Sequence, residues 1–80
     1  MIYYTIYVKN LSNGTGYIDV ALPDDKLMKD YLQFLDLGLR PHHSYPMAQP
    51  AGSREGAGTF AINMSDIMAI TTIMSPPKRP

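Results

Sequence analysis

The sequence predicts a small α+β domain in which two β-hairpins flank one amphipathic helix, in the order ββαββ. Three observations support this. Segment 23–38 has the apolar spacing, the start signal and the stop signal of a helix. On each side of it lie two stretches rich in β-branched and aromatic residues, which are typical of strands. Between the helix and the second pair, segment 39–58 keeps no hydrophobic period. We expect an antiparallel or mixed four-stranded sheet with the helix on one face.

The first hairpin is predicted over residues 2–22. Two strands, 2–8 and 17–22, are separated by a segment whose strongest turn signal is Asn13-Gly14. Side chains alternate between the two faces of a strand. One face of this hairpin is therefore aliphatic and suits the helix, and the other face carries Tyr3, Tyr7 and Tyr17.

The helix begins after Pro23 and Asp24, which suit the unpaired amides of a first turn. It ends at Gly38, where a left-handed residue closes the last turn. At about 100° per residue its apolar side chains cover an arc of roughly 160°, wider than one sheet face needs. We expect Leu27 and Leu35 to be buried against the sheet, and the rest of the arc to invite a second partner. The arc contains Leu27, Met28, Tyr31, Leu32, Phe34 and Leu35.

Segment 39–58 is predicted to be one long loop, because it contains three prolines and three glycines. Ordering one residue costs about 1–2 kcal/mol of backbone entropy, so twenty ordered residues cost roughly 20–40 kcal/mol. The burial of a single small core does not easily supply the free energy that offsets this cost. The loop is expected either to move freely or to be held by a ligand or a second subunit.

The second hairpin follows the loop, with a strand over 59–64 and another over 67–74. Ser65 allows a helix start in the second of these segments. The β-branched run from Ile70 to Ile73 favours a strand instead. The chain is thus expected to form one domain over residues 1–74, followed by a flexible proline-rich tail over 75–80.

Composition limits the classes of function. The chain has no cysteine, no signal peptide before its first strand, and no apolar run of the roughly 20 residues that cross a bilayer. We therefore expect a cytoplasmic protein without a membrane partner. Seven basic residues balance seven acidic ones, which argues against binding to duplex DNA. The basic excess lies after Leu39, so any anion site is expected in that half.

No motif predicts catalysis, a cofactor or a metal site. Segment 52–58 resembles a phosphate-binding loop only in its glycines, since it leads into a strand and not a helix. His42 and His43 are the only histidines, and neighbours in an extended chain point in opposite directions. A zinc site would need further ligands. We expect neither an enzyme nor a metalloprotein.

The long loop instead predicts capture of a small anion, with a nucleotide or phosphate compound as the favoured class. Arg40 and Arg54 would pair with the anion, and His42 and His43 would donate hydrogen bonds. Tyr45 could stack on a base. The remaining contacts would come from the Ser53 hydroxyl and from backbone amides at Gly56 and Gly58. The function predicted is that of a non-enzymatic, homo-oligomeric binding protein.

A second function remains open, that of a protein–protein inhibitor or adaptor. The row of Tyr3, Tyr7 and Tyr17 suits a subunit or partner interface, or a platform for a planar ligand. It is equally compatible with ordinary half-buried strand tyrosines. The general plan, a cysteine-free ββαββ chain with one long loop, is similar to that of small accessory proteins of phages and mobile elements. Such a protein would act through the tyrosine face, the loop or the C-terminal tail.

Overall fold

The structure is a computed structural model that describes residues 1–9, 16–48 and 58–76 of the 80-residue chain. Within this part the chain forms one α-helix and five strands in two antiparallel sheets, so the α+β class is confirmed. In chain order the elements are β1 (Ile2–Val8), β2 (Tyr17–Leu22), α1 (Lys26–Leu37), β3 (His42–Pro46), β4 (Thr59–Asn63), a 3-10 turn (Met64–Asp66) and β5 (Ile67–Ile73).

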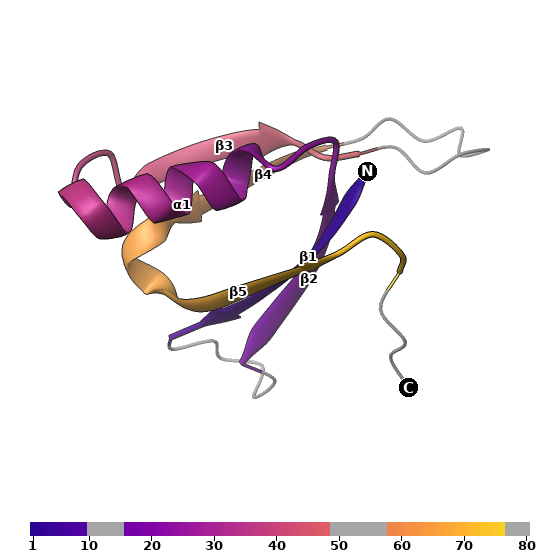
Figure 1. The fold of residues 1–80 in the computed structure, drawn as a ribbon, viewed down its shortest axis with the longest axis horizontal. Helices are drawn as coiled ribbons and strands as arrows, with labels where there is room; N and C mark the ends of the chain where they lie inside the picture. The colour runs from indigo at the N-terminus through magenta and orange to yellow at the C-terminus, as the bar shows by residue number, and fades with distance from the viewer. Residues whose placement is uncertain (10–15, 49–57, 77–80) are drawn as a thin grey trace.

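The larger sheet has three strands in the order β2-β1-β5, with the N-terminal strand in the centre. Tyr4 of β1 lies opposite Val20 on one side and Thr72 on the other. The predicted C-terminal strand is thus confirmed as β5. α1 and the β3–β4 hairpin lie over one face of this sheet (Figure 1). The core fills the space between the two layers and consists of Tyr4, Ile6, Leu22, Leu27, Tyr31, Tyr45, Met64 and Ile67.

The segment 42–46 is a strand, whereas the sequence predicts a loop there. It pairs with β4, so that His43 lies opposite Ile62, and the two strands form a separate sheet. The single four-stranded sheet expected from the sequence is therefore wrong. The backbone groups of β3 are paired by β4, which lies further along the chain. Such pairing is not visible in the hydrophobic period of the β3 residues themselves. Residues 49–57 of the predicted loop lie outside the described part.

The helix has the ends that the sequence predicts. The Asp24 carboxylate accepts a hydrogen bond from the Lys26 amide at 3.0 Å, which pairs one of the free amides of the first turn. At the other end Gly38 has a left-handed φ of 70°, and its amide donates to the Phe34 carbonyl oxygen at 2.7 Å. A glycine takes this conformation without the strain that a Cβ atom would cause.

The apolar arc of α1 is only partly covered. Leu27 and Tyr31 are buried, whereas Leu35 is 61% exposed, so its predicted burial is wrong. Leu32 is exposed as well. The sheet covers the centre of the arc, and the β3–β4 hairpin contacts one flank through Tyr45. The opposite flank therefore has no covering element among the described residues.

Buried tyrosines join the helix to the strands. The Tyr4 hydroxyl donates to the Asp24 carbonyl oxygen at 2.8 Å, at the start of the helix. The Tyr31 hydroxyl lies 3.5 Å from the Ile67 carbonyl oxygen, at the start of β5. Each buried hydroxyl thus has a partner, which avoids the cost of an unpaired polar group. Of the helices described, none is long and apolar enough to cross a membrane.

We predict that Leu27→Ala lowers the free energy of unfolding by about 2–5 kcal/mol, because the side chain is fully buried and its loss leaves a cavity. Leu37→Ala is the matched control on the same helix, since Leu37 is exposed, and it should change stability by no more than about 0.5 kcal/mol. Urea unfolding of the two variants tests this. Equal losses would contradict the helix orientation described.

Candidate functional site

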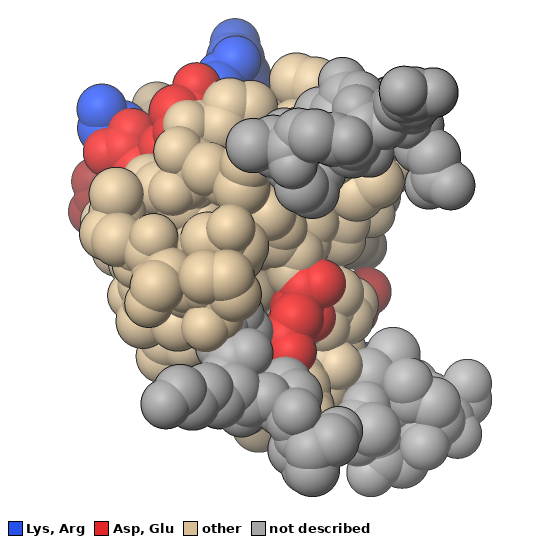
Figure 2. Space-filling model, turned by 90° about the vertical axis from the view of Figure 1, so that its right-hand side faces the viewer, with Lys and Arg blue, Asp and Glu red and all other residues tan. Residues whose placement is uncertain are grey.

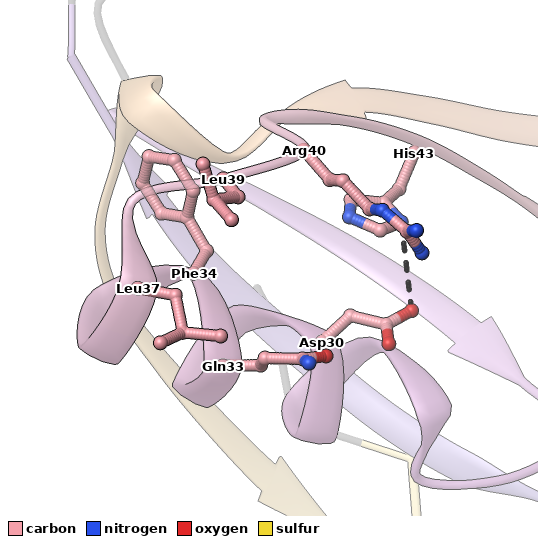
Figure 3. Close-up of a pocket in the computed structure, with 7 residues that line it drawn as sticks. All are labelled: Asp30, Gln33, Phe34, Leu37, Leu39, Arg40 and His43. Carbon is pink, nitrogen blue, oxygen red and sulfur yellow. Dashed lines mark ion pairs between the residues drawn. The ribbon is translucent and has the colours of Figure 1, made fainter.

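A pocket of about 240 Å³ lies between the C-terminal half of α1 and the segment that leads into β3. One end is polar: Asp30, Arg40 and His43 line it, and the dashed line in Figure 3 marks the pair of Asp30 and His43. The other end is apolar. The lining residues are Asp30, Gln33, Phe34, Leu37, Leu39, Arg40 and His43.

The Asp30 carboxylate is the polar centre of this pocket. Its Oδ2 atom accepts a hydrogen bond of 2.7 Å from the Tyr45 hydroxyl and lies 3.6 Å from His43 Nδ1. The His43 and Tyr45 rings are stacked, with centroids 6.0 Å apart and planes 13° apart. Helix and hairpin are thereby joined at one carboxylate. The sequence does not predict Asp30 as a site residue, although its place at the border of the apolar arc of the helix is a usable signal.

Tyr45 is a buried residue that contacts the site through its hydroxyl group. It is only 4% exposed, so its ring is not open to stack on a ligand as the sequence predicts. Burial raises its pKa well above the ordinary value, and the hydrogen bond to the Asp30 carboxylate raises it further. The hydroxyl therefore keeps its proton and remains a donor to Asp30.

Arg40 lines the pocket and has an unusual backbone conformation. Its φ of 55° is left-handed, and it is the only non-glycine residue with positive φ in the described part of the chain. Such a conformation is strained for a residue with a Cβ atom. Gly38 is left-handed too, and together these residues turn the chain from the helix end into β3. Within the described residues no carboxylate lies within ion-pair distance of Arg40.

The other predicted ligand residues do not gather around the pocket. His42 is exposed and, as the neighbour of His43 in a strand, points to the opposite face of the hairpin. Gly58 lies beyond the far end of β3, where its carbonyl oxygen accepts a hydrogen bond of 2.9 Å from the Met47 amide. Ser53, Arg54 and Gly56 lie outside the described residues. Of the predicted set, Arg40 and His43 thus line the same pocket, and the His43 ring stacks on Tyr45.

The predicted tyrosine row lies on the face of the three-stranded sheet turned away from the helix. Tyr7 is 40% exposed, and its ring centroid is 6.2 Å from that of Tyr17, with the planes tilted by 54°. Tyr3 is half-buried on the same face. Between them the buried Thr5 hydroxyl donates to the Asp19 carboxylate at 2.7 Å.

Charged side chains are sparse on part of the surface. On the side of the molecule shown in Figure 2, most of the surface formed by described residues is uncharged, with acidic and basic side chains covering small areas of it. Among the described residues, no group of three His, Asp or Glu side chains could hold a metal ion. Comparison with protein-family models, with curated proteins and with solved structures finds no match to this chain.

The tyrosine pKa values predict a loss of stability at high pH. The unfolded chain ionises its tyrosines near the ordinary pKa of 10.0, whereas the folded chain holds Tyr4 and Tyr45 protonated above it. The unfolded state therefore binds fewer protons, and the free energy of unfolding falls as pH rises above about 10. The slope is up to about 1.4 kcal/mol per pH unit for each tyrosine. Urea unfolding from pH 9 upward measures it, and Tyr45→Phe should make it less steep. An unchanged slope in that variant would contradict the burial of Tyr45.

Proposed function

We propose that this chain is a non-enzymatic, homo-oligomeric, cytosolic binding protein that captures a small anionic ligand in the pocket between α1 and β3. The observation that carries the proposal is Arg40. This residue lines the pocket, and its guanidinium has no ion-pair partner among the described carboxylates. Its backbone has a strained, left-handed conformation. Strained residues often occur at functional sites.

The polar end of the pocket supports a ligand with one anionic group. Arg40 offers paired N–H donors that match a carboxylate or phosphate, and His43 lines the same pocket. Asp30 would repel a second negative charge. The Tyr45 hydroxyl limits that repulsion, because it donates a hydrogen bond to the Oδ2 atom of Asp30. A singly charged carboxylate or phosphate ester therefore suits the site better than a triphosphate.

The apolar end of the pocket supports a ligand with a short hydrophobic part. Phe34, Leu37 and Leu39 line it, and their contact would add to the ionic one. Pockets for drug-sized ligands occupy about 300–1,000 Å³. The 240 Å³ of this pocket is smaller. A nucleotide, the class favoured by the sequence, would extend beyond the pocket, and contacts from Ser53, Arg54 and Gly56 remain predictions for such a ligand.

A second candidate function is that of a protein-binding inhibitor or adaptor. The exposure of large apolar side chains on three surfaces favours it: Leu32 and Leu35 on the helix, Tyr7 on the outer sheet face, and Met68 in β5. Apolar patches of this kind are typical of interaction sites. On this hypothesis the tyrosine row and not Arg40 would be needed for binding.

We predict that Arg40→Gly weakens binding of the anion by about 10- to 100-fold, because a hydrogen bond to a charged group contributes roughly 1.5–3 kcal/mol. Stability should be equal or higher, since glycine adopts a φ of 55° without strain. Calorimetric titration with inorganic phosphate, a nucleoside monophosphate and a short aliphatic carboxylate tests the affinity, and urea unfolding tests the stability.

Lys29→Ala is the control for loss of one positive charge. Lys29 lies on the exposed face of the helix, where its Nζ atom is 3.4 Å from Asp25, and it does not line the pocket. Its removal should leave the titration unchanged. Equal losses from the two variants would mean that Arg40 acts only through net charge, and no heat from any of the anions would reject ligand capture.

A further inference from the structure

We propose that two copies of this chain pair through the outer edge of β5, while α1 of each copy packs against α1 of the other. The result is a six-stranded sheet, ordered β2-β1-β5-β5-β1-β2, with two helices on one face. This inference rests on the homo-oligomeric part of the proposed function and names the surface responsible. It does not depend on the ligand in the pocket.

The first observation is the composition of the β5 edge. In the described part of the chain β5 is an outer strand of its sheet, and its seven residues, Ile67–Ile73, carry no charge and no proline. Proteins that keep an edge strand unpaired usually protect it with charges, prolines or a short length. Here Met68 is 65% exposed and Ile73 is 44% exposed. Among the described residues no strand pairs with this edge, and apolar side chains lie next to its backbone groups.

The opposite edge of the same sheet is protected. β2 carries Asp19, and the Ala21 carbonyl oxygen already accepts a hydrogen bond of 2.9 Å from the Ala48 amide. A further strand would therefore meet a charge and an occupied acceptor at β2, and neither at β5. The difference between the two edges directs pairing to β5.

The second observation is the exposed flank of α1. The β3–β4 hairpin contacts the helix on the side of Asp30, through Tyr45 and His43. The other flank carries Leu32 and Leu35, which are 56% and 61% exposed. In Figure 1, α1 lies in front of the hairpin and β5 lies in front of β1. The uncovered flank of the helix and the outer edge of β5 therefore face the same side of the molecule.

These two surfaces together favour a second copy over a foreign peptide. A peptide strand added to β5 would cover the edge and leave the leucine flank in water. A copy related by a twofold axis brings its own helix and covers both surfaces at once. The uncharged β5 also pairs with itself in antiparallel fashion without placing like charges opposite each other in any register.

The spacing of the elements agrees with this arrangement. The Tyr4 hydroxyl of β1 bonds Asp24, just before α1, and the Tyr31 hydroxyl of α1 lies near Ile67 of β5, so the helix lies near both strands. If α1 lies over the space between β1 and β5, the α1 helices of the two copies would be about two strand spacings apart, or roughly 10 Å. Packed helices lie about 8–10 Å apart. The two helices would thus be in contact without overlapping.

The test is the mass of the protein in solution, measured by sedimentation equilibrium over the micromolar range. Wild type should be a dimer. Thr72→Lys should raise the dissociation constant by about 100-fold, because it places a charged side chain on the uncharged edge strand with which the second copy pairs. Ser44→Lys is the matched control, since it adds the same charge at another exposed strand position, on β3. It should leave the dimer intact.

Leu35→Lys tests the helix contact separately and should also yield monomers, with an unchanged far-ultraviolet circular dichroism spectrum.

Each other outcome overturns the inference in a distinguishable way. A wild-type monomer at all concentrations would reject both the interface and the homo-oligomeric part of the proposed function, while anion titration would still test the pocket. An oligomer that survives Thr72→Lys and Leu35→Lys would reject this interface alone. If that oligomer dissociated on replacing Tyr3 and Tyr7 by aspartate, the interface would be the tyrosine face.

Discussion

The hydrogen bond between the buried Tyr45 hydroxyl and the Asp30 carboxylate is the contact on which the pocket depends. A buried hydroxyl requires a partner, and this one finds it on the helix. The bond fixes the β3–β4 hairpin against α1 and holds Asp30 beside His43. Without it the pair of Asp30 and His43 would be the polar connection left between helix and hairpin among the contacts described.

The position of Arg40 follows from how the helix ends. Gly38 closes the last turn in a left-handed conformation, and Arg40 repeats that conformation two residues later. The chain thereby reverses over a short distance and returns along the helix as β3. An arginine held in a conformation that favours glycine indicates a constraint other than backbone preference. The proposed anion site explains why a cation occupies that position.

The exposed surfaces follow from the small size of the molecule. One helix and one short hairpin cover the central part of the larger sheet, which buries Tyr4 and Ile6. They do not reach across the helix flank at Leu35 or along the edge of β5. A small chain buries a limited share of its apolar surface, and association is a common way to bury the rest. The proposed ligand capture and the proposed self-association would therefore use different parts of this molecule, and each is open to a separate test.

The sequence by itself determined the elements whose signals are local. The period and end signals of α1, and the β-branched composition of β1, β2, β4 and β5, depend on residues that are neighbours in the chain. Only the tertiary structure decided that residues 42–46 form a strand, that Tyr45 is buried and that Leu35 is exposed. It also decided that Asp30, Arg40 and His43 line one pocket. These features arise from pairing and packing between distant segments, and a local hydrophobic pattern carries no information about such partners.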